Sequence, residues 1–159
     1  MIGTLHYRQM TLGDIPRILE IELKSFSLPW SEEAFQMELT QNHFAKYVVA
    51  EMEGRVIGYA GTWIIIDEAH VTNVAVDPEY RGHSIGETLM KQLMVLAIAH
   101  GAERMTLEVR VSNTVAQNLY AKMGFLSHGI RKGYYTDNRE DAMIMWAELP
   151  RPTTDYEME

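Results

Sequence analysis

The sequence predicts an α/β (α+β) fold in which one mixed sheet is covered by helices on both faces. Segments rich in β-branched and aromatic residues alternate with segments whose apolar residues recur at helical spacing, in the order β-α-α-β-β-β-α-β-α-β-β. The chain has 159 residues, and it carries no internal repeat, low-complexity tract or interdomain linker. We therefore expect a single domain over residues 1–149, followed by an acidic, proline-containing and mobile tail at 150–159.

The N-terminal segment predicts a strand followed by an amphipathic helix. Residues 4–10 are predicted as the strand, and Thr11 with an acid three residues later is typical of a helix N-terminus. The helix is expected over 12–26. Its apolar residues share one face, and they are Ile15, Ile18, Leu19 and Phe26.

A second helix and a strand pair are predicted next. Ser31 is expected to begin the helix, and Trp30 and Phe35 occupy the positions that pack together as a hydrophobic staple across a helix start. Two strands follow at 47–52 and 56–66, and the Glu-Gly pair between them predicts a tight turn.

The C-terminal half alternates strands with two helices. The predicted strands are 71–76, 105–110, 125–135 and 142–149, and the predicted helices are 84–100 and 114–123. Gly101 and Gly124 stand directly after the two helices, where glycine commonly ends a helix in the left-handed conformation.

Composition limits the classes of function. With 14 Lys and Arg against 22 Asp and Glu, the net charge is -8, which disfavours direct nucleic-acid binding and suits a basic partner. The absence of cysteine excludes a disulfide framework and a thiolate nucleophile. No apolar run approaches the ~20 residues of a membrane helix, no signal peptide is evident, and the six scattered histidines have no metal-ligand spacing. We expect a cytoplasmic protein with neither a membrane partner nor a metal.

Residues 74–86 place a strand, a small-residue turn and a helix start in succession. The free N–H groups at a helix start attract anions, glycines such as Gly82 and Gly86 let a pyrophosphate approach the backbone, and Arg81 adds a positive charge. An ordinary strand-to-helix connection has the same glycines. A dinucleotide-binding fold is disfavoured, because the full G-x-G-x-x-G pattern is missing.

A carboxylate and a phenol follow further along the chain. Glu108 lies on the opposite face of the predicted strand from its apolar neighbours, which also suits a surface carboxylate paired with Arg110. Asn113 and Tyr120 are seven positions apart, so they share nearly the same helical face. Core packing is the alternative for Tyr120, because it lies on an apolar stripe.

Together these segments resemble the GNAT acetyltransferases. The pyrophosphate loop of that family has Arg or Gln, two residues, Gly, one residue, and then Gly or Ala; Arg81 and Gly86 match it, whereas Ser84 stands where Gly is usual. Several separated segments resemble the branch of bacterial ribosomal-protein alanine N-acetyltransferases (RimI), and they are 27–31, 73–78, 107–113 and 131–135.

The resemblance implies a central mixed, mostly antiparallel sheet and acetyl-CoA as cosubstrate. Because the chain has no cysteine, direct transfer in a ternary complex is the simpler scheme, and a relay through serine or tyrosine is the alternative. The resemblance implies Glu108 as the general base and Tyr120 as the general acid. The residues implied to contact the cofactor are Val74, Ala75, Val76, Arg81, Gly82, His83, Ser84, Ile85, Gly86, Glu87 and Asn113. Leu28 and Tyr134 are implied to line the substrate groove. The implied substrate is a protein N-terminus, that of the basic small-subunit ribosomal protein number eighteen with its N-terminal alanine.

Two other functions fit parts of the pattern. An acetyltransferase for a small amine, such as a polyamine or an aminoglycoside, would use the same cofactor loop with a closed acidic pocket. A non-catalytic acetyl-CoA-binding module would need the loop alone, and the pairing of Glu108 with Tyr120 disfavours it.

Overall fold

A computed structural model describes residues 3–151, so the predicted tail lies, from residue 152 on, outside the described residues. Seven strands and four α-helices are present in that range. The strands are β1 (Leu5–Gln9), β2 (Ala45–Met52), β3 (Arg55–Ile65), β4 (Glu68–Val76), β5 (Arg104–Arg110), β6 (Leu126–Arg131) and β7 (Ala142–Glu148). The helices are α1 (Ile15–Ser25), α2 (Glu32–Thr40), α3 (Ile85–Ala99) and α4 (Thr114–Lys122), with short 3₁₀ turns η1 (Leu12–Asp14) and η2 (Pro78–Tyr80).

The strands form one mixed sheet in the order β1-β2-β3-β4-β5-β7-β6. The pairs β1–β2, β2–β3, β5–β7 and β6–β7 are antiparallel, and β4–β5 is parallel. This confirms the predicted order of elements and the predicted sheet class. The chain divides into two compact units, the first made of residues 1–63 and 71–93 and the second of 64–70 and 94–159.

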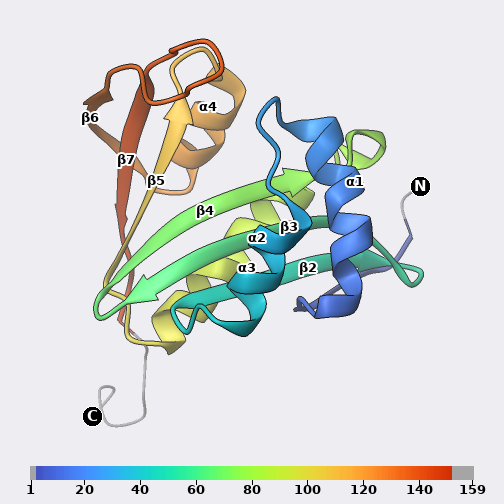
Figure 1. Cartoon of the computed structure of the whole chain (residues 1–159). Helices are drawn as coiled ribbons and strands as arrows, with labels where there is room; N and C mark the ends of the chain where they lie inside the picture. The colour runs from blue at the N-terminus through green and yellow to red at the C-terminus, as the bar shows by residue number, and fades with distance from the viewer. Residues whose placement is uncertain (1–2, 152–159) are drawn as a thin grey trace, which may run out of the picture. The chain divides into compact units, whose positions relative to one another are not determined.

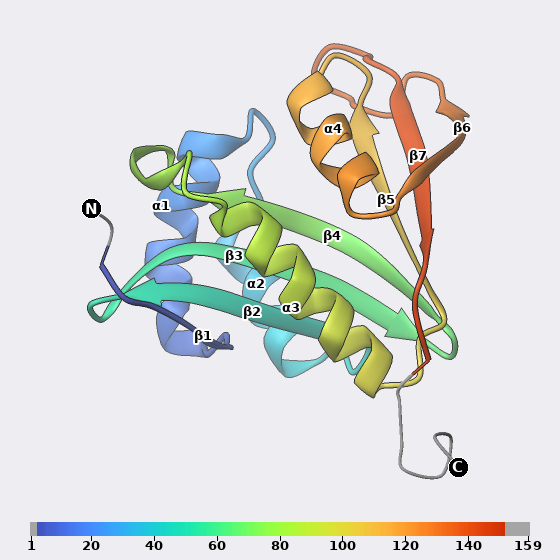
Figure 2. The ribbon, with the colours of Figure 1, turned by 180° about the vertical axis from the view of Figure 1, so that it is seen from behind.

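In the first unit, helices cover both faces of the strands. Figure 1 shows α1 and α2 on one face of β2 and β3, and Figure 2 shows α3 on the opposite face. The core of this unit includes Ile15, Ile18, Ile21, Phe35, Tyr47, Val49, Val56, Tyr59 and Ala75. Of the apolar face predicted for the first helix, Ile15 and Ile18 are buried and Leu19 is partly buried against this core.

Capping contacts fix the 3₁₀ turn η1, which leads into α1, and the start of α2. The backbone N–H of Thr11 donates to Asp14 Oδ2 at 2.8 Å, and the Ser31 hydroxyl accepts the Ala34 N–H at 3.1 Å. The rings of Trp30 and Phe35 lie 5.2 Å apart, which confirms the predicted staple.

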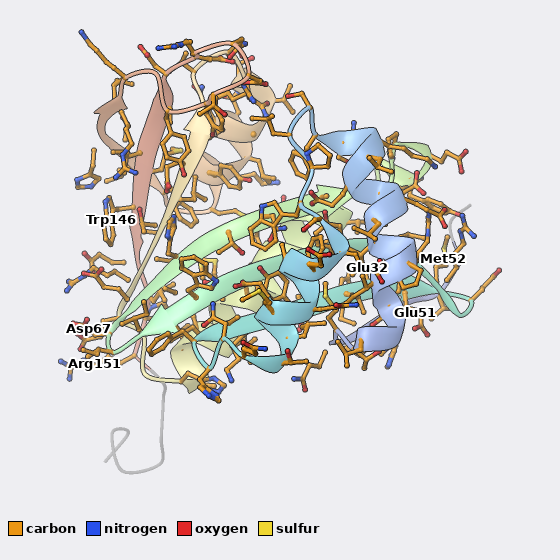
Figure 3. The ribbon with its side chains drawn as sticks, in the orientation of Figure 1. Glu32, Glu51, Met52, Asp67, Trp146 and Arg151 are labelled. Carbon is orange, nitrogen blue, oxygen red and sulfur yellow. The ribbon has the colours of Figure 1, made fainter. Side chains whose placement is uncertain are left out.

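A single guanidinium joins the start of α1 to the end of β2. Arg8 donates to Asp14 and also to Glu51, whose position at the end of β2 is labelled in Figure 3. The strand β1 that carries this guanidinium is therefore connected to β2 by a side chain as well as by its ladder of backbone hydrogen bonds.

Several sequence-based boundaries are wrong by one or more residues. The first helix ends at Ser25, and Phe26 has extended backbone angles and is 38% exposed, so it leaves the buried face. β4 begins at Glu68, three residues earlier than predicted, because polar residues alternate with buried ones there. β6 ends at Arg131, since Gly133 has a positive φ of 61° and turns the chain out of the ladder.

In the second unit, α4 packs beside β5 and β7 (Figure 2). The buried residues of this unit include Met105, Leu107, Val109, Phe125, Ala142, Met145 and Ala147. The turn before β4 is joined to β5, because Arg104 donates to Asp67 at 3.2 Å; Asp67 is labelled in Figure 3. Every residue of β6 is exposed, as suits an edge strand.

Among residues 3–151, no helix is both long enough and apolar enough to cross a membrane.

Candidate functional site

The first unit carries the predicted pyrophosphate loop, and a buried carboxylate fixes the point where the loop begins. Asp77 follows β4 directly and is 0% exposed. Its carboxylate accepts the Arg17 guanidinium at 2.5 Å and the Glu79 N–H at 3.1 Å. Burial acts to raise the pKa of Asp77, but the hydrogen bonds from Arg17 and Glu79 outweigh it and lower the pKa below the ordinary value. The turn is therefore anchored as an ionised, paired carboxylate.

The loop itself exposes backbone to solvent. Gly82 and Ser84 both have positive φ, 89° and 60°. Ser84 thus adopts the left-handed conformation that the usual glycine would take, so the departure from the family pattern keeps the backbone path. Ile85, the first residue of α3, is 2% exposed and anchors the helix start.

The loop residues fit a pyrophosphate. A Cβ added at Gly82 would meet nothing within 4 Å, so the backbone there is open to a ligand. The first turn of α3 supplies N–H groups that have no acceptor within the helix, and the helix dipole favours an anion at the same place. His83 is exposed beside these groups, whereas Gly86 and Glu87 are partly buried in the first turn.

Arg81 is held against the end of β4. Its Nε donates to the Val76 carbonyl at 3.2 Å, and its Nη2 donates to Ser25 Oγ at 3.4 Å. The guanidinium is thereby brought to the strand predicted to contact the cofactor. On that strand Ala75 is buried, while Val74 and Val76 are partly exposed.

Leu28 lies between α1 and α2 and is 51% exposed. Its apolar side chain is therefore available to a ligand, as the predicted substrate contact requires. The backbone nearby is fixed, because the Trp30 N–H donates to Glu22 Oε2 at 2.8 Å.

The second unit carries the predicted base. Glu108 lies on β5 with its side chain opposite the buried Leu107 and Val109, as the strand alternation predicts. His70 on β4 approaches it, with Nε2 at 2.8 Å from Oε2 and 3.1 Å from Oε1. The Tyr134 hydroxyl donates to Oε1 at 3.0 Å.

These contacts determine the ionisation of Glu108. Burial acts to raise its pKa, but the hydrogen bond and charge of His70, the Tyr134 hydroxyl and the charge of Arg131 together lower it below the ordinary value. Glu108 is consequently a carboxylate at neutral pH, able to accept a proton. The surface pairing with Arg110 does not form in the residues described, since Arg110 donates instead to Asp137 at 2.8 Å and to Glu140 at 3.2 Å.

Tyr134 lies in a loop rather than in the strand predicted for it. The Gly133 N–H donates to Asp141 Oδ1 at 2.9 Å, and the Arg131 guanidinium lies 5.3 Å from the centre of the Tyr134 ring. Burial raises the pKa of Tyr134, so its phenol stays protonated and remains a donor.

Tyr120 and Asn113 occupy α4 and its N-terminus. Burial raises the pKa of Tyr120, and its ring lies 5.8 Å from that of Phe125. Its hydroxyl makes no hydrogen bond to any group within residues 3–151, Glu108 included. Asn113 caps the helix, with its Oδ1 accepting the Ala116 N–H at 3.1 Å. The oxygen of its side chain is therefore used within the helix, and the predicted cofactor contact would fall to the side-chain NH₂ group.

His70 is the residue that the sequence analysis missed. The spacing of the six histidines matches no metal-ligand motif, and spacing along the chain gives His70 no other role. The signal that could have found it is its position on a strand parallel to that of Glu108, which brings residues 38 positions apart together.

The predicted site residues thus form two groups. Glu108 and Tyr134 are in contact in the second unit, which also holds Asn113 and Tyr120; the loop, the end of β4 and Leu28 belong to the first unit. Within the described part of the chain, no group of three His, Cys, Asp or Glu residues could hold a metal ion.

Comparison with known proteins assigns the family. Residues 15–125 match the model of the acetyltransferase (GNAT) family. The chain belongs to this family. The predicted family and the GNAT fold are therefore confirmed, and the loop and carboxylate described above are those of a GNAT protein.

The chain is 51% identical over 142 residues to a Bacillus subtilis (strain 168) protein provisionally named ribosomal protein bS18-alanine N-acetyltransferase, and the match covers 89% of this chain and 94% of that protein. It is 37% identical over 136 residues to the enzyme of that name from Escherichia coli (strain K12), covering 83% of this chain and 89% of the enzyme. A crystal structure of the Escherichia coli ribosomal-protein-S18-alanine N-acetyltransferase superposes with a TM-score of 0.86 at 32% identity, covering 96% of this chain and 98% of that one.

Proposed function

We propose that this chain transfers the acetyl group of acetyl-CoA to the N-terminal amine of a protein, namely the N-terminal alanine of ribosomal protein bS18. The main structural support for this reaction is the ionised carboxylate of Glu108, which is largely shielded from water and accepts hydrogen bonds from two donors. The choice of substrate rests on the two relatives named for that activity. We further propose that residues 1–149 act as one acetyltransferase domain and that the enzyme works in the bacterial cytoplasm.

Glu108 is the proposed general base. A protein α-amine has a pKa of about 7.7–8.0, so at neutral pH most of it is protonated and cannot attack a carbonyl. Glu108 Oε accepts that proton, directly or through a water, and frees the nitrogen lone pair. Acetyl-CoA supplies the acetyl group as an activated thioester, and the N–C bond forms as the C–S bond breaks.

Tyr120 is the proposed general acid. Burial keeps its phenol protonated at neutral pH, so Tyr120 Oη holds a proton for the departing sulfur. In becoming the amide N–H, the ammonium loses two protons: one leaves through Glu108 to solvent, and the other replaces the proton that Tyr120 gives to the sulfur. No cysteine is present to form a covalent acetyl-enzyme, which favours direct transfer.

Backbone groups of the first unit are proposed to hold the cofactor. The N–H groups from Gly82 to Glu87 would bind the pyrophosphate, because the loop has two left-handed residues and leads into α3. The main chain of residues 74–76 would pair with the pantetheine arm, and Asn113 would contribute its side-chain amide.

The substrate contacts are proposed from exposed side chains. Leu28 is an exposed apolar residue between two helices, and Tyr134 is 38% exposed while its hydroxyl lies on Glu108. An N-terminus that contacts Tyr134 would thus be next to the proposed base. The net charge of -8 favours a basic ribosomal protein over a nucleic acid or an anionic membrane surface.

The test is acetylation of a matched peptide panel with products identified by mass spectrometry. The peptides begin with the bS18 sequence, and they differ in the first residue, in a blocked α-amine, or in an added lysine. We expect one acetyl group, located on the α-amine, in the peptide that begins with alanine. Transfer to spermidine but not to peptides would instead favour a small-amine acetyltransferase, and acetyl-CoA binding without any transfer would favour a non-catalytic module.

A further inference from the structure

His70 on β4 and Glu108 on β5 lie in contact on two parallel strands. The register pairs Glu68 with Arg104, and its last pair is His70 with Thr106. Glu108 is two residues beyond Thr106, so its side chain lies on the same face of the strand as that of Thr106. The sheet therefore brings the imidazole to the carboxylate through its backbone register.

The contact has the geometry of a charge-assisted hydrogen bond. The Nε2–Oε2 distance is 2.8 Å, and the second oxygen is 3.1 Å away. The side chain of Glu108 is 10% exposed and that of His70 is 40% exposed. The carboxylate is thus screened from water, and two protein donors, His70 Nε2 and Tyr134 Oη, contact it in place of water.

The other groups that face Glu108 cannot replace His70. Arg131 contributes charge from β6, but no hydrogen bond between its guanidinium and Glu108 is present in the described structure. On β5 itself, the Thr106 hydroxyl donates to the Met145 carbonyl at 3.0 Å, and Arg110 is engaged by Asp137 and Glu140. The register partner on β7 is the uncharged Ile144.

We propose that His70 is a positioning residue for the acetyl transfer, one whose Nε2–H fixes the orientation of the Glu108 carboxylate toward the substrate amine. The proposal rests on the proposed function, in which Glu108 accepts the amine proton. Because an ionised carboxylate can only accept hydrogen bonds, His70 Nε2 carries a proton in this contact. Tyr134 holds the other oxygen, so His70 and Tyr134 together restrict rotation of the carboxylate about its last bond.

The test compares His70→Ala with His70→Gln. The alanine variant loses the donor, and we expect kcat to fall about tenfold or more, the rate equivalent of one hydrogen bond to a charged group, while KM for acetyl-CoA stays unchanged. Glutamine supplies an N–H in place of Nε2 and should recover most of kcat. His128→Ala is the matched control, since His128 is an exposed histidine of the same unit, and it should leave kcat unchanged.

A pH profile and a spectrum separate positioning from a purely structural role. Removing His70 removes an interaction that lowers the pKa of Glu108, so the acid limb of kcat at saturating peptide should move to higher pH in His70→Ala. In the wild-type protein, ¹⁵N NMR of the imidazole should show that Nε2 carries a proton. This spectrum remains informative even if the alanine variant does not fold.

Three results would overturn the proposal: an Nδ1–H tautomer, kcat of His70→Ala within twofold of wild type, or a glutamine variant no better than alanine. Failure of the proposed function would look different. Glu108→Gln would then keep its activity, whereas an inactive Glu108→Gln beside a normal His70→Ala would reject only the role of His70.

Discussion

Two shielded carboxylates, one in each unit, have opposite electrostatic environments. Glu22 on α1 is 1% exposed and accepts hydrogen bonds from the Tyr59 hydroxyl and the Trp30 N–H, and burial is the main cause of its raised pKa. Glu108 on β5 is also desolvated, but His70 contributes a hydrogen bond and charge that lower its pKa. The difference shows that a partner with positive charge can reverse the direction in which burial shifts the pKa of a carboxylate.

The hydrogen-bond partners also distinguish a structural carboxylate from a catalytic one. The donors to Glu22 are uncharged, and they come from β3 and from the segment that leads into α2, so this carboxylate joins elements of the first unit. The donors to Glu108 are the Tyr134 phenol and the His70 imidazole, a type of side chain that can carry positive charge and that has no counterpart among the donors to Glu22. We infer that Glu22 contributes to stability and Glu108 to catalysis.

The largest expected effect is on turnover. Glu108→Gln should lower kcat by about 10²–10⁴-fold, the range of positioned proton transfer, while acetyl-CoA affinity changes little. Steady-state kinetics and calorimetry measure the two quantities. Glu103→Gln is the control, because Glu103 is an exposed acid just before β5, and it should turn over normally. Near-normal kcat in Glu108→Gln would make Glu108 a structural carboxylate like Glu22.

The next effect is on stability. Glu22→Ala leaves the Trp30 N–H and the Tyr59 hydroxyl buried without an acceptor, and we expect a loss of about 2–4 kcal/mol in the free energy of unfolding. Urea titration measures it. Glu20→Ala is the control, since the Glu20 side chain is 59% exposed on the same helix. Loss of its ion pair with Arg17 should lower the free energy of unfolding by less than about 1 kcal/mol.

The pH dependence of the same site has a definite sign. The pKa of Glu22 is higher in the folded state, so its protonated form contributes stability that is present at acid pH and lost as pH rises through the folded pKa. Glu22→Gln cannot titrate. The free energy of unfolding of Glu22→Gln, minus that of wild type, should therefore increase from acid to neutral pH. A difference that stays constant with pH would contradict the raised pKa of Glu22.

A smaller effect is expected at the second donor to Glu108. Tyr134→Phe removes one hydrogen bond while keeping the ring, so kcat should fall by about two- to tenfold. The acid limb of kcat should move to higher pH, because the Tyr134 hydroxyl lowers the pKa of Glu108. Tyr80→Phe, a change of a tyrosine in the first unit, serves as the control. An unchanged profile would show that Tyr134 does not affect the carboxylate in solution.

The smallest effect concerns backbone rather than charge. Ser84 has φ of 60°, a conformation that costs a residue with a Cβ roughly 1–2 kcal/mol, so Ser84→Gly should leave stability unchanged or raise it by up to about 1 kcal/mol. Acetyl-CoA affinity by calorimetry should change less than twofold, because backbone donors remain. A large loss of affinity would show that the serine hydroxyl itself contacts the cofactor.

The sequence predicted the elements whose periodicity is local. The buried face of α1, the staple of Trp30 with Phe35 and the outward side of Glu108 all follow from spacing within one helix or strand. The resemblance named Glu108, but nothing near it in the chain indicates its partners.

What the sequence missed depends on contacts between distant segments. His70 reaches Glu108 only through the parallel register of β4 with β5. Residues 132–135 leave the predicted strand because Gly133 donates to Asp141, eight positions away, across a turn with positive φ. The left-handed backbone conformation of Ser84 also could not be predicted from its residue type, since serine ordinarily avoids that conformation.

The most direct test of the central claim, that Glu108 takes the proton of the amine, is the pH dependence of kcat in Glu108→Gln beside that in Tyr120→Phe. Rising pH deprotonates the peptide amine in solution and so replaces the missing base. We predict that the Gln variant recovers part of its activity above about pH 8, whereas the Tyr120→Phe variant, whose defect is in protonating the sulfur, does not. Equal recovery in both variants, or none in Glu108→Gln, would contradict the account.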